Sequence, residues 1–263
     1  MANRIDIKLA QVRASGRPAL VPWVTVGYPD IETSEALAEA IIDAGADMLE
    51  MGVPFSDPLA DGPTIQAASQ RAREHGVNID TALEVLRHLR EKGVETPLIF
   101  MGYLNPVFHY GTKRFAENAS ASGLDGIIIP DLPSDEAGPY KDILEERGIY
   151  LIPLLAPTST DERIAEACKA AKGFIYCVSL SGVTGARSEV SADTSGLVRR
   201  IRQHTDLPVL VGFGVSLRRH VEQIGEYADG AVVASALLNA IDAAPRDKVL
   251  EVAGEFVRGL IPK

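Results

Sequence analysis

Short apolar segments alternate with segments of helical periodicity along this chain, and this alternation restricts the possible folds more than any other feature of the sequence. Eight apolar segments follow one another, at residues 20–26, 48–51, 98–101, 126–130, 150–155, 174–178, 209–211 and 230–233. Residues of helical period lie between them and after the last one, at 34–44, 79–91, 113–121, 135–147, 161–171, 195–203, 217–224 and 248–258. The apolar segments show no strict polar alternation, which is typical of parallel strands covered by helices.

Repeated strand–helix units of this length favour an α/β fold, a single-domain (β/α)8 TIM barrel that spans residues 1–263. Residues 1–11 predict a short amphipathic helix before the first strand, and an extra short helix is expected after the eighth. Two doubly wound halves are the competing architecture. Three positions are expected to cap helices, namely Thr33 or Ser34, Ser134 and Thr160.

Charge and cysteine content exclude several classes of function. A formal net charge of -10 and a pI near 5.0 argue against DNA or RNA as a partner, because these polyanions need clustered Lys and Arg. No uncharged run approaches the roughly 20 residues of a membrane span, and the N-terminus has no apolar signal-peptide core. Cys168 and Cys177 lack metal-ligand spacing and are too few for a disulfide framework. We therefore expect a soluble, cytoplasmic protein.

Two acidic residues stand out in the stretch 49–66, LEMGVPFSDPLADGPTIQ. Glu50 ends a strand, where an unpaired carboxylate costs several kcal/mol or stays protonated. Asp61 follows in a loop stiffened by three prolines. Because reactive groups in barrels lie where strands end, Glu50 and Asp61 form a candidate catalytic pair. The alternatives are that Asp61 caps a helix expected at 64–73 and that Glu50 pairs with a buried cation.

The last strands predict a phosphate site. Residues 209–214, VLVGFG, end a strand in two glycines, and residues 232–235, VVAS, end the next one directly before a helix. The loops after strands seven and eight form the usual phosphate site of a barrel, to which Ser235 would add a hydroxyl. The segment 180–186, LSGVTGA, is a third contributor. The alternative is that these glycines only permit tight packing and that Ser235 only caps a helix.

Other side chains give weaker signals. Four aromatic residues would offer aromatic surface near the barrel mouth or simply pack in the core, namely Trp23, Tyr103, Tyr176 and Phe213. The five histidines are scattered, and they support neither a metal site nor a Ser-His-Asp triad. Asp57 and Asp131 lie beside prolines and are interpreted as turn or interface residues.

Over essentially its whole length the chain resembles the tryptophan synthase alpha family. The resemblance rests on residues 50–66, 105–108, 131–133, 181–186 and 212–214. It implies a TIM barrel that cleaves indole-3-glycerol phosphate into indole and glyceraldehyde 3-phosphate, a retro-aldol lyase reaction of L-tryptophan biosynthesis without cofactor or metal. It also implies that Glu50 protonates the indole ring carbon and helps remove the glycerol hydroxyl proton. Asp61 would stabilise the positive charge at the indole nitrogen.

The same resemblance implies further site residues. Tyr176 would position the catalytic acid, and Thr184 would hold Asp61 when the loop closes. The residues expected to bind the substrate and its phosphate are Trp23, Tyr176, Thr184, Gly185, Phe213, Gly214, Ala234 and Ser235.

Three positions depart from the family pattern, which often has glycine at 234, arginine at 180 and phenylalanine at 23. The methyl group of Ala234 would crowd the phosphate or strain a backbone with positive φ. Leu180 supplies no charge, and Trp23 would narrow the indole pocket.

Partners also follow from the resemblance. A pyridoxal-phosphate beta subunit would receive indole through a tunnel in an alpha2beta2 complex, with residues 54–58 and 131–133 on the docking face. The nearest rival is a stand-alone indole-glycerol-phosphate lyase. A barrel kept only as an allosteric partner, and an unrelated isomerase or aldolase, are more distant alternatives. A Schiff-base aldolase would need a lysine at a strand end, where the sequence has none.

Overall fold

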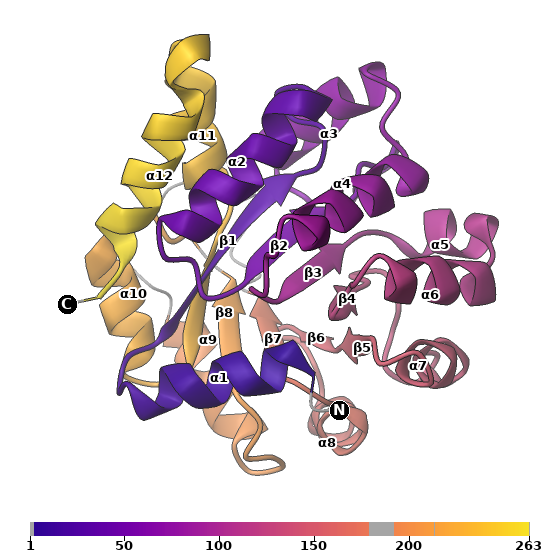
Figure 1. Cartoon of the computed structure of the whole chain (residues 1–263). Helices are drawn as coiled ribbons and strands as arrows, with labels where there is room; N and C mark the ends of the chain where they lie inside the picture. Colours follow the sequence, from indigo (N-terminus) through magenta and orange to yellow (C-terminus); the bar gives the residue numbers. More distant parts are fainter. Residues whose placement is uncertain (1–2, 179–191, 213, 263) are drawn as a thin grey trace.

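The strands of the protein form one parallel sheet. The computed structural model describes residues 3–178, 192–212 and 214–262. Within these ranges the strand order is β5-β4-β3-β2-β1-β9-β8-β7-β6 (Figure 1). The strands are β1 (Ala19–Thr25), β2 (Leu49–Gly52), β3 (Leu98–Met101), β4 (Gly126–Ile128), β5 (Tyr150–Ile152), β6 (Leu154–Leu155), β7 (Ile175–Val178), β8 (Val209–Gly212) and β9 (Gly230–Val233). Because β1 pairs with both β2 and β9, the two halves of the chain share one sheet, and two separate doubly wound halves are excluded.

A proline divides the fifth predicted strand and brings the two ends of the sheet together. Pro153 has no N–H to donate and separates β5, which pairs with β4, from β6, which pairs with β7. Its carbonyl still accepts a hydrogen bond of 3.0 Å from the N–H of Tyr176. The first and last strands of the sheet order are thus neighbours in the chain. The sheet is a nearly closed barrel, and the predicted (β/α)8 fold is confirmed.

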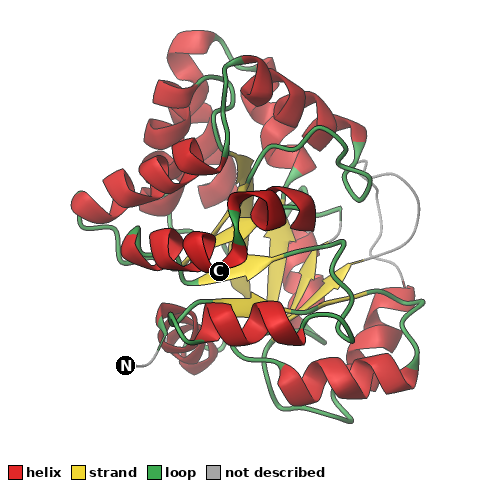
Figure 2. Ribbon diagram, turned by 90° about the vertical axis from the view of Figure 1, so that its right-hand side faces the viewer, coloured by secondary structure: helices red, strands yellow, loops and turns green. Residues whose placement is uncertain are grey.

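Helices surround the strands, as Figure 2 shows. They are α1 (Arg4–Ala14), α2 (Ile31–Asp43), α3 (Pro63–Glu74), α4 (Ile79–Glu91), α5 (Leu104–Tyr110), α6 (Thr112–Ala121), α7 (Gly138–Glu145), α8 (Asp161–Ala170), α9 (Ala192–Ile201), α10 (Arg218–Gly225), α11 (Ser235–Ala243) and α12 (Val249–Leu260), with a 3-10 turn at Arg246–Lys248. Each long helix buries one apolar face. In α4 that face consists of Ile79, Ala82, Leu83, Val85, Leu86 and Leu89. No helix in the described ranges has the length and apolarity that a membrane crossing requires.

Two helices complete the barrel at its ends. The predicted N-terminal helix is α1, whose fully buried Ile5 reaches Gly126 and Gly173 at the amino ends of the strands. A Cβ at Gly126 would lie 3.0 Å from Ile5, so this helix packs directly on strand backbone. The predicted extra helix after the eighth strand is α11, which begins two residues after β9 ends.

Helix caps differ from prediction at two of three positions. Asp30 caps α2 by accepting a 2.8 Å hydrogen bond from the N–H of Thr33, so Thr33 and Ser34 were wrongly predicted as caps. The Ser34 hydroxyl instead accepts the N–H of Gly27 at 2.9 Å. Ser134 was also wrongly predicted, because α7 begins only at Gly138 and has no side-chain cap. Thr160 does cap α8 and is confirmed.

Candidate active site

Glu50 lies deep inside the barrel. It is the second residue of β2, in register with Trp23 on β1 and Ile99 on β3, and its side chain is only 1% exposed. Its Oε1 atom has no hydrogen-bond partner among the described residues, and the only described charge that acts on it is the negative charge of Asp61. Burial, and then the negative charge of Asp61, raise the pKa of Glu50 to about 8. Within the described chain the alternative of a buried ion pair is therefore wrong.

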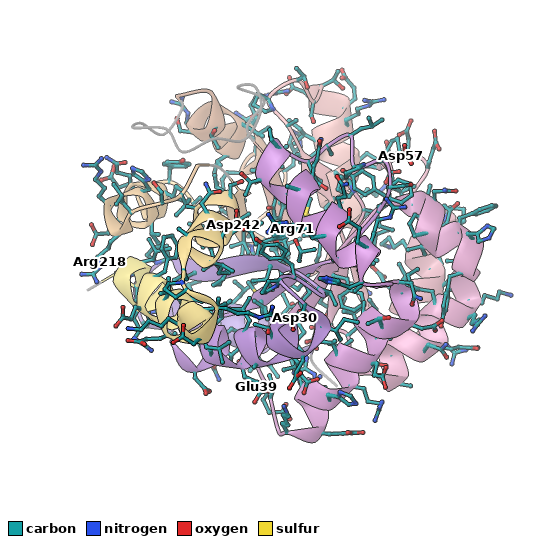
Figure 3. The ribbon with its side chains drawn as sticks, turned by 90° about the horizontal axis from the view of Figure 1, so that it is seen from above. Asp30, Glu39, Asp57, Arg71, Arg218 and Asp242 are labelled. Carbon is teal, nitrogen blue, oxygen red and sulfur yellow. The ribbon has the colours of Figure 1, made fainter. Side chains whose placement is uncertain are left out.

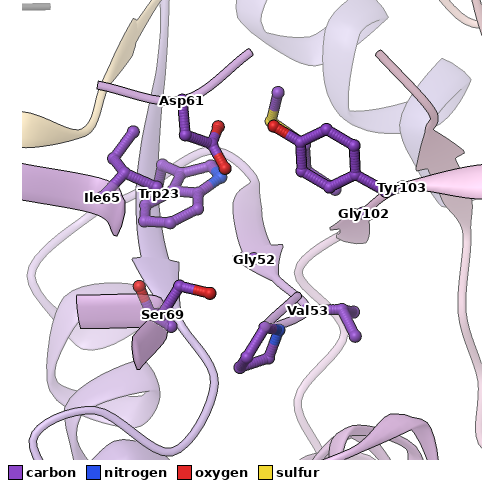
Figure 4. A pocket seen from close by; sticks show the side chains of 11 residues that line it. Trp23, Gly52, Val53, Asp61, Ile65, Ser69, Gly102 and Tyr103 are labelled. Atoms are coloured by element: carbon purple, nitrogen blue, oxygen red, sulfur yellow. The ribbon is translucent and has the colours of Figure 1, made fainter. Parts of the chain in front are cut away.

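Asp61 is held in the loop before α3. Its N–H donates to the carbonyl of Pro58 at 3.0 Å, and its own carbonyl accepts the side-chain amide of Gln66 at 2.9 Å. The helix begins with Gly62 as N-cap and has no side-chain cap, so Asp61 is not a capping residue. Burial raises the pKa of Asp61 to about 6, and a hydrogen bond with Tyr103 opposes this rise. These two backbone hydrogen bonds fix the loop, and the Asp61 carboxyl points into a pocket (Figure 4).

The pocket lies where β1, β2 and β3 end. It is lined by Trp23, Thr25, Gly52, Val53, Pro54, Asp61, Ile65, Ser69, Met101, Gly102 and Tyr103. Its free space is about 10 Å³, which is room for about one water molecule. The ring of Trp23 forms part of its wall and lies so close to Gly52 that a Cβ there would collide with it.

Tyr176 lies on β7, across the barrel from β2. It is 5% exposed, and its hydroxyl lies against Gly212, where a Cβ would collide with it. Burial, followed by the charges of Glu50 and Asp61, raises the pKa of Tyr176 well above its usual value. Tyr176 is therefore a neutral hydroxyl close enough to both acids to sense their charge.

The ends of β8 and β9 expose backbone amides. Gly214 has a φ of +49° and open space where a Cβ would point. Ser235 begins α11, which has no side-chain cap, and the amides before Leu238 have no acceptor within the helix. Ala234 has a φ of -122°, so the positive φ considered for it is wrong. An anion is favoured at such a helix start.

A surface network joins the helices that begin at these two places. Arg71 of α3 and Asp242 of α11 form an ion pair of 3.0 Å, and both are seen side by side from above in Figure 3. The buried Tyr28 donates its hydroxyl to the same carboxylate at 2.5 Å. The loop after β1 is thereby tied to both helices.

Some site residues lie outside the described residues or were not predicted. Leu180, Thr184, Gly185 and Phe213 are not among the described residues. Tyr103 was predicted only as aromatic surface or as a core residue, yet it is a partner of Asp61 and accepts the N–H of Ala60 at 2.9 Å. Thr25 was not singled out, although it is 1% exposed and its hydroxyl has no partner within the described ranges. Its position at a strand end was the available signal.

Within the described ranges no group of three or more His, Cys, Asp or Glu residues is placed to hold a metal ion. Cys168 and Cys177 are both free and buried.

Fold and site define a class of protein, the (β/α)8 barrels that hold one carboxyl group on a strand and a second in the loop after it, both with a raised pKa. A family model described as "Tryptophan synthase alpha chain" matches residues 9–258. The chain belongs to the tryptophan synthase alpha chain family.

Relatives and solved structures agree with this assignment. The tryptophan synthase alpha chain of Roseiflexus castenholzii is 49% identical over 97% of this chain and 98% of its own length. A longer "Tryptophan synthase" of Saccharomyces cerevisiae is 40% identical over 99% of this chain but only 37% of its own length. Among structures, tryptophan synthase subunit alpha from Legionella pneumophila has a TM-score of 0.91 at 36% identity, covering 99% of this chain and 97% of that one. A Mycobacterium tuberculosis tryptophan synthase has a TM-score of 0.90 at 39% identity, covering 99% of both chains.

Proposed function

We propose that Glu50 and Asp61 divide the acid–base work of one retro-aldol cleavage, which converts indole-3-glycerol phosphate into indole and glyceraldehyde 3-phosphate in L-tryptophan biosynthesis. The observation that supports this most is the unequal rise of the two pKa values, to about 8 for Glu50 and about 6 for Asp61. At neutral pH Glu50 is then mostly protonated and can donate, while Asp61 is mostly ionised. Glu50 on β2 thus supplies a proton donor, and Asp61 in the loop after β2 supplies an anion, to the same reaction.

The two carboxyl groups account for each proton in turn. The Glu50 carboxyl protonates the indole carbon that bears the glycerol chain, and the Asp61 carboxylate stabilises the positive charge that appears at the ring nitrogen. The resulting Glu50 carboxylate takes the proton of the adjacent glycerol hydroxyl. The carbon–carbon bond then breaks, its electron pair restores the aromatic ring, and the hydroxyl carbon becomes the aldehyde. Glu50 ends protonated, as it began.

The remaining residues would orient the substrate. The neutral hydroxyl of Tyr176 faces both acids, and the ring of Trp23 offers a wall for the indole. Gly214, Ala234 and Ser235 would present backbone amides to the phosphate. The roles of Thr184, Gly185 and Phe213 rest on the family resemblance alone.

None of these steps calls for a metal or an organic cofactor, and we propose that the chain works without one. Pyridoxal phosphate would belong to a beta-subunit partner.

A beta subunit is the partner that the surface supports. Leu59 and Phe108 are 92% and 66% exposed, the highest values among the large apolar side chains of the described residues, and a partner that covered them would bury apolar area. Leu59 directly follows the segment 54–58, and Phe108 lies on α5, whose first residue, Leu104, donates its N–H to Asp131 at 2.9 Å. The longer Saccharomyces relative, which contains this unit as 37% of its length, is consistent with a partner fused to the chain. We propose that the complex works in the cytoplasm. A stand-alone lyase is not favoured, because the relatives are tryptophan synthase alpha chains.

The proposed chemistry is tested by steady-state kinetics of Glu50→Gln and Asp61→Asn on indole-3-glycerol phosphate. Loss of the acid should lower kcat by about 10²–10⁴, with a smaller change in KM, because proton transfer acts in the transition state. Glu74→Gln, an exposed glutamate of α3, is the matched control and should keep its activity. Full lyase activity in Glu50→Gln would remove this mechanism.

A further inference from the structure

The indole N–H of Trp23 is a buried donor without an acceptor. The side chain is 3% exposed, and its Nε1 atom has no hydrogen-bond partner within the described ranges. Native proteins leave few buried donors unpaired, and those that remain often have a functional reason. Packing against Gly52 restrains the ring, so the N–H cannot easily turn out to solvent. The question is which acceptor this donor serves.

Asp61 is the acceptor that the pocket provides. Trp23 and Asp61 line the same pocket, and Figure 4 shows the Asp61 carboxyl over the ring of Trp23. Three other polar side chains line this pocket. The Thr25 hydroxyl has no partner among the described residues, but it is neutral and therefore a weaker acceptor than a carboxylate. The other two are already engaged. The Ser69 hydroxyl bonds to the backbone of Phe55, and the Tyr103 hydroxyl accepts the N–H of Ala60. Glu50 is not among the residues that line this pocket. The pocket has room for only about one water molecule, so little solvent competes with the Asp61 carboxylate for the donor.

We propose that Trp23 is a positioning residue whose indole N–H donates a hydrogen bond to the Asp61 carboxylate and keeps it ionised opposite Glu50. The proposal deepens the proposed function, because it explains how Asp61 stays anionic in a buried site. A hydrogen bond to the charged form of an acid favours that form. Phenylalanine, frequent at this position in the family, has no such donor.

Several titratable groups act on Asp61 from the surrounding elements. Glu50 faces it from β2 and Tyr176 from β7, while Tyr103 bonds to it from the segment after β3. The negative charge of Asp131 contributes to the raised pKa of Tyr103. The lining residues on β1 and α3 are uncharged. Burial opposes ionisation of Asp61 and raises its pKa, while Tyr103 and, in our proposal, Trp23 favour ionisation.

The chain offers a direct test, because Trp23 is its only tryptophan and gives a single indole N–H signal in a proton–nitrogen NMR spectrum. We expect this signal to move between pH 4 and pH 8.5 with a midpoint below about pH 6, because burial raises the pKa of Asp61 to about 6 and the proposed hydrogen bond lowers it again. Asp61→Asn should abolish the movement, and Glu50→Gln should keep it. Tyr103→Phe, which removes the other donor to Asp61, should raise the midpoint by about one pH unit. Trp23 fluorescence gives a second reading of the same titration.

A titration that is absent, that survives in Asp61→Asn, or that disappears in Glu50→Gln would overturn the proposal. None of these readings depends on lyase activity, so they stay distinct from a failure of the proposed function.

Kinetics supply an independent test. Trp23→Phe keeps an aromatic ring and removes the N–H, so the acid limb of kcat against pH should move up by about one unit, with kcat lost mainly below about pH 6.5. An acid limb at the wild-type pH would contradict the proposal, whereas a change in KM alone would indicate only a packing role.

Discussion

A carboxyl group that stays protonated near neutral pH makes the folded state less stable, because the unfolded chain ionises it freely. The pKa of Glu50 is about 8 in the fold against 4.5 for an ordinary glutamate. Between these values the folded protein binds more protons than the unfolded one, so stability falls as pH rises from 4.5 to 8. The raised pKa of Asp61 acts in the same direction at lower pH, between 3.8 and about 6.

Glu50→Gln should therefore be more stable than the wild type, although it loses activity. At pH 7 the linkage corresponds to roughly 3 kcal/mol, and we expect the variant to gain about 2–3 kcal/mol there. The gain should vanish below about pH 4.5, where both chains are neutral at this position. Urea unfolding at pH 4.5, 7 and 8 measures it. Equal stabilities at pH 8 would show that the Glu50 carboxyl is not destabilised in the fold.

Sequence predicted the acids better than their surroundings. Glu50 and Asp61 could be found because a carboxylate at a strand end or in a proline-stiffened loop is conspicuous. That Tyr103 bonds to Asp61, and that Thr25 has an unpaired hydroxyl, depend on side-chain directions across three strands. Such directions follow from barrel register, which the sequence pattern does not supply.

At the scale of elements, the periodicity of the sequence predicted where helices lie, whereas helix starts and strand breaks depend on contacts with residues far away in the chain. Residues 79–91 were predicted as a helix and form α4 with those bounds. In contrast, α5 was not predicted, because its start is fixed by the side chain of Asp131, 27 residues away. Residues 150–155 were predicted as one strand, although the sequence shows Pro153 within it. The role of Pro153 in closing the barrel depends on the hydrogen bond that its carbonyl accepts from Tyr176.

The cap of α2 allows a stability prediction. Asp30→Ala removes an acceptor of the Thr33 N–H and should cost about 1 kcal/mol, with a further small loss from the ion pair of Asp30 with Arg246. Ser134→Ala is the control, because Ser134 caps no helix, and it should change stability by less than about 0.5 kcal/mol. Thermal unfolding of both variants tests whether Asp30 caps α2. Similar losses in the two would contradict the cap assignment.

At the scale of the whole molecule, the sequence predicted the barrel because eight units of one kind leave few alternatives. Its extent as one domain over residues 1–263 stays a prediction that the single sheet supports. The docking face is a prediction of the same scale, since it combines segments after β2, β3 and β4.

Phe108→Ser tests the docking face. If this exposed ring is buried by a beta subunit, its loss should weaken binding at least tenfold, because buried aromatic residues dominate interface energetics. Ile7→Ser is the matched control, an exposed apolar residue of α1 at the amino ends of the strands, and it should bind as the wild type does. Calorimetric titration with a purified beta subunit gives both affinities. An unchanged affinity in Phe108→Ser would place the partner elsewhere.

The close packing of Trp23 on Gly52 has a consequence for how this barrel can evolve. Atoms Cζ2 and Cη2 of the indole occupy the space that any side chain at 52 would need, and phenylalanine has neither atom. Tryptophan at 23 and any larger residue at 52 therefore compete for the same space, so a substitution at either position depends on the residue at the other.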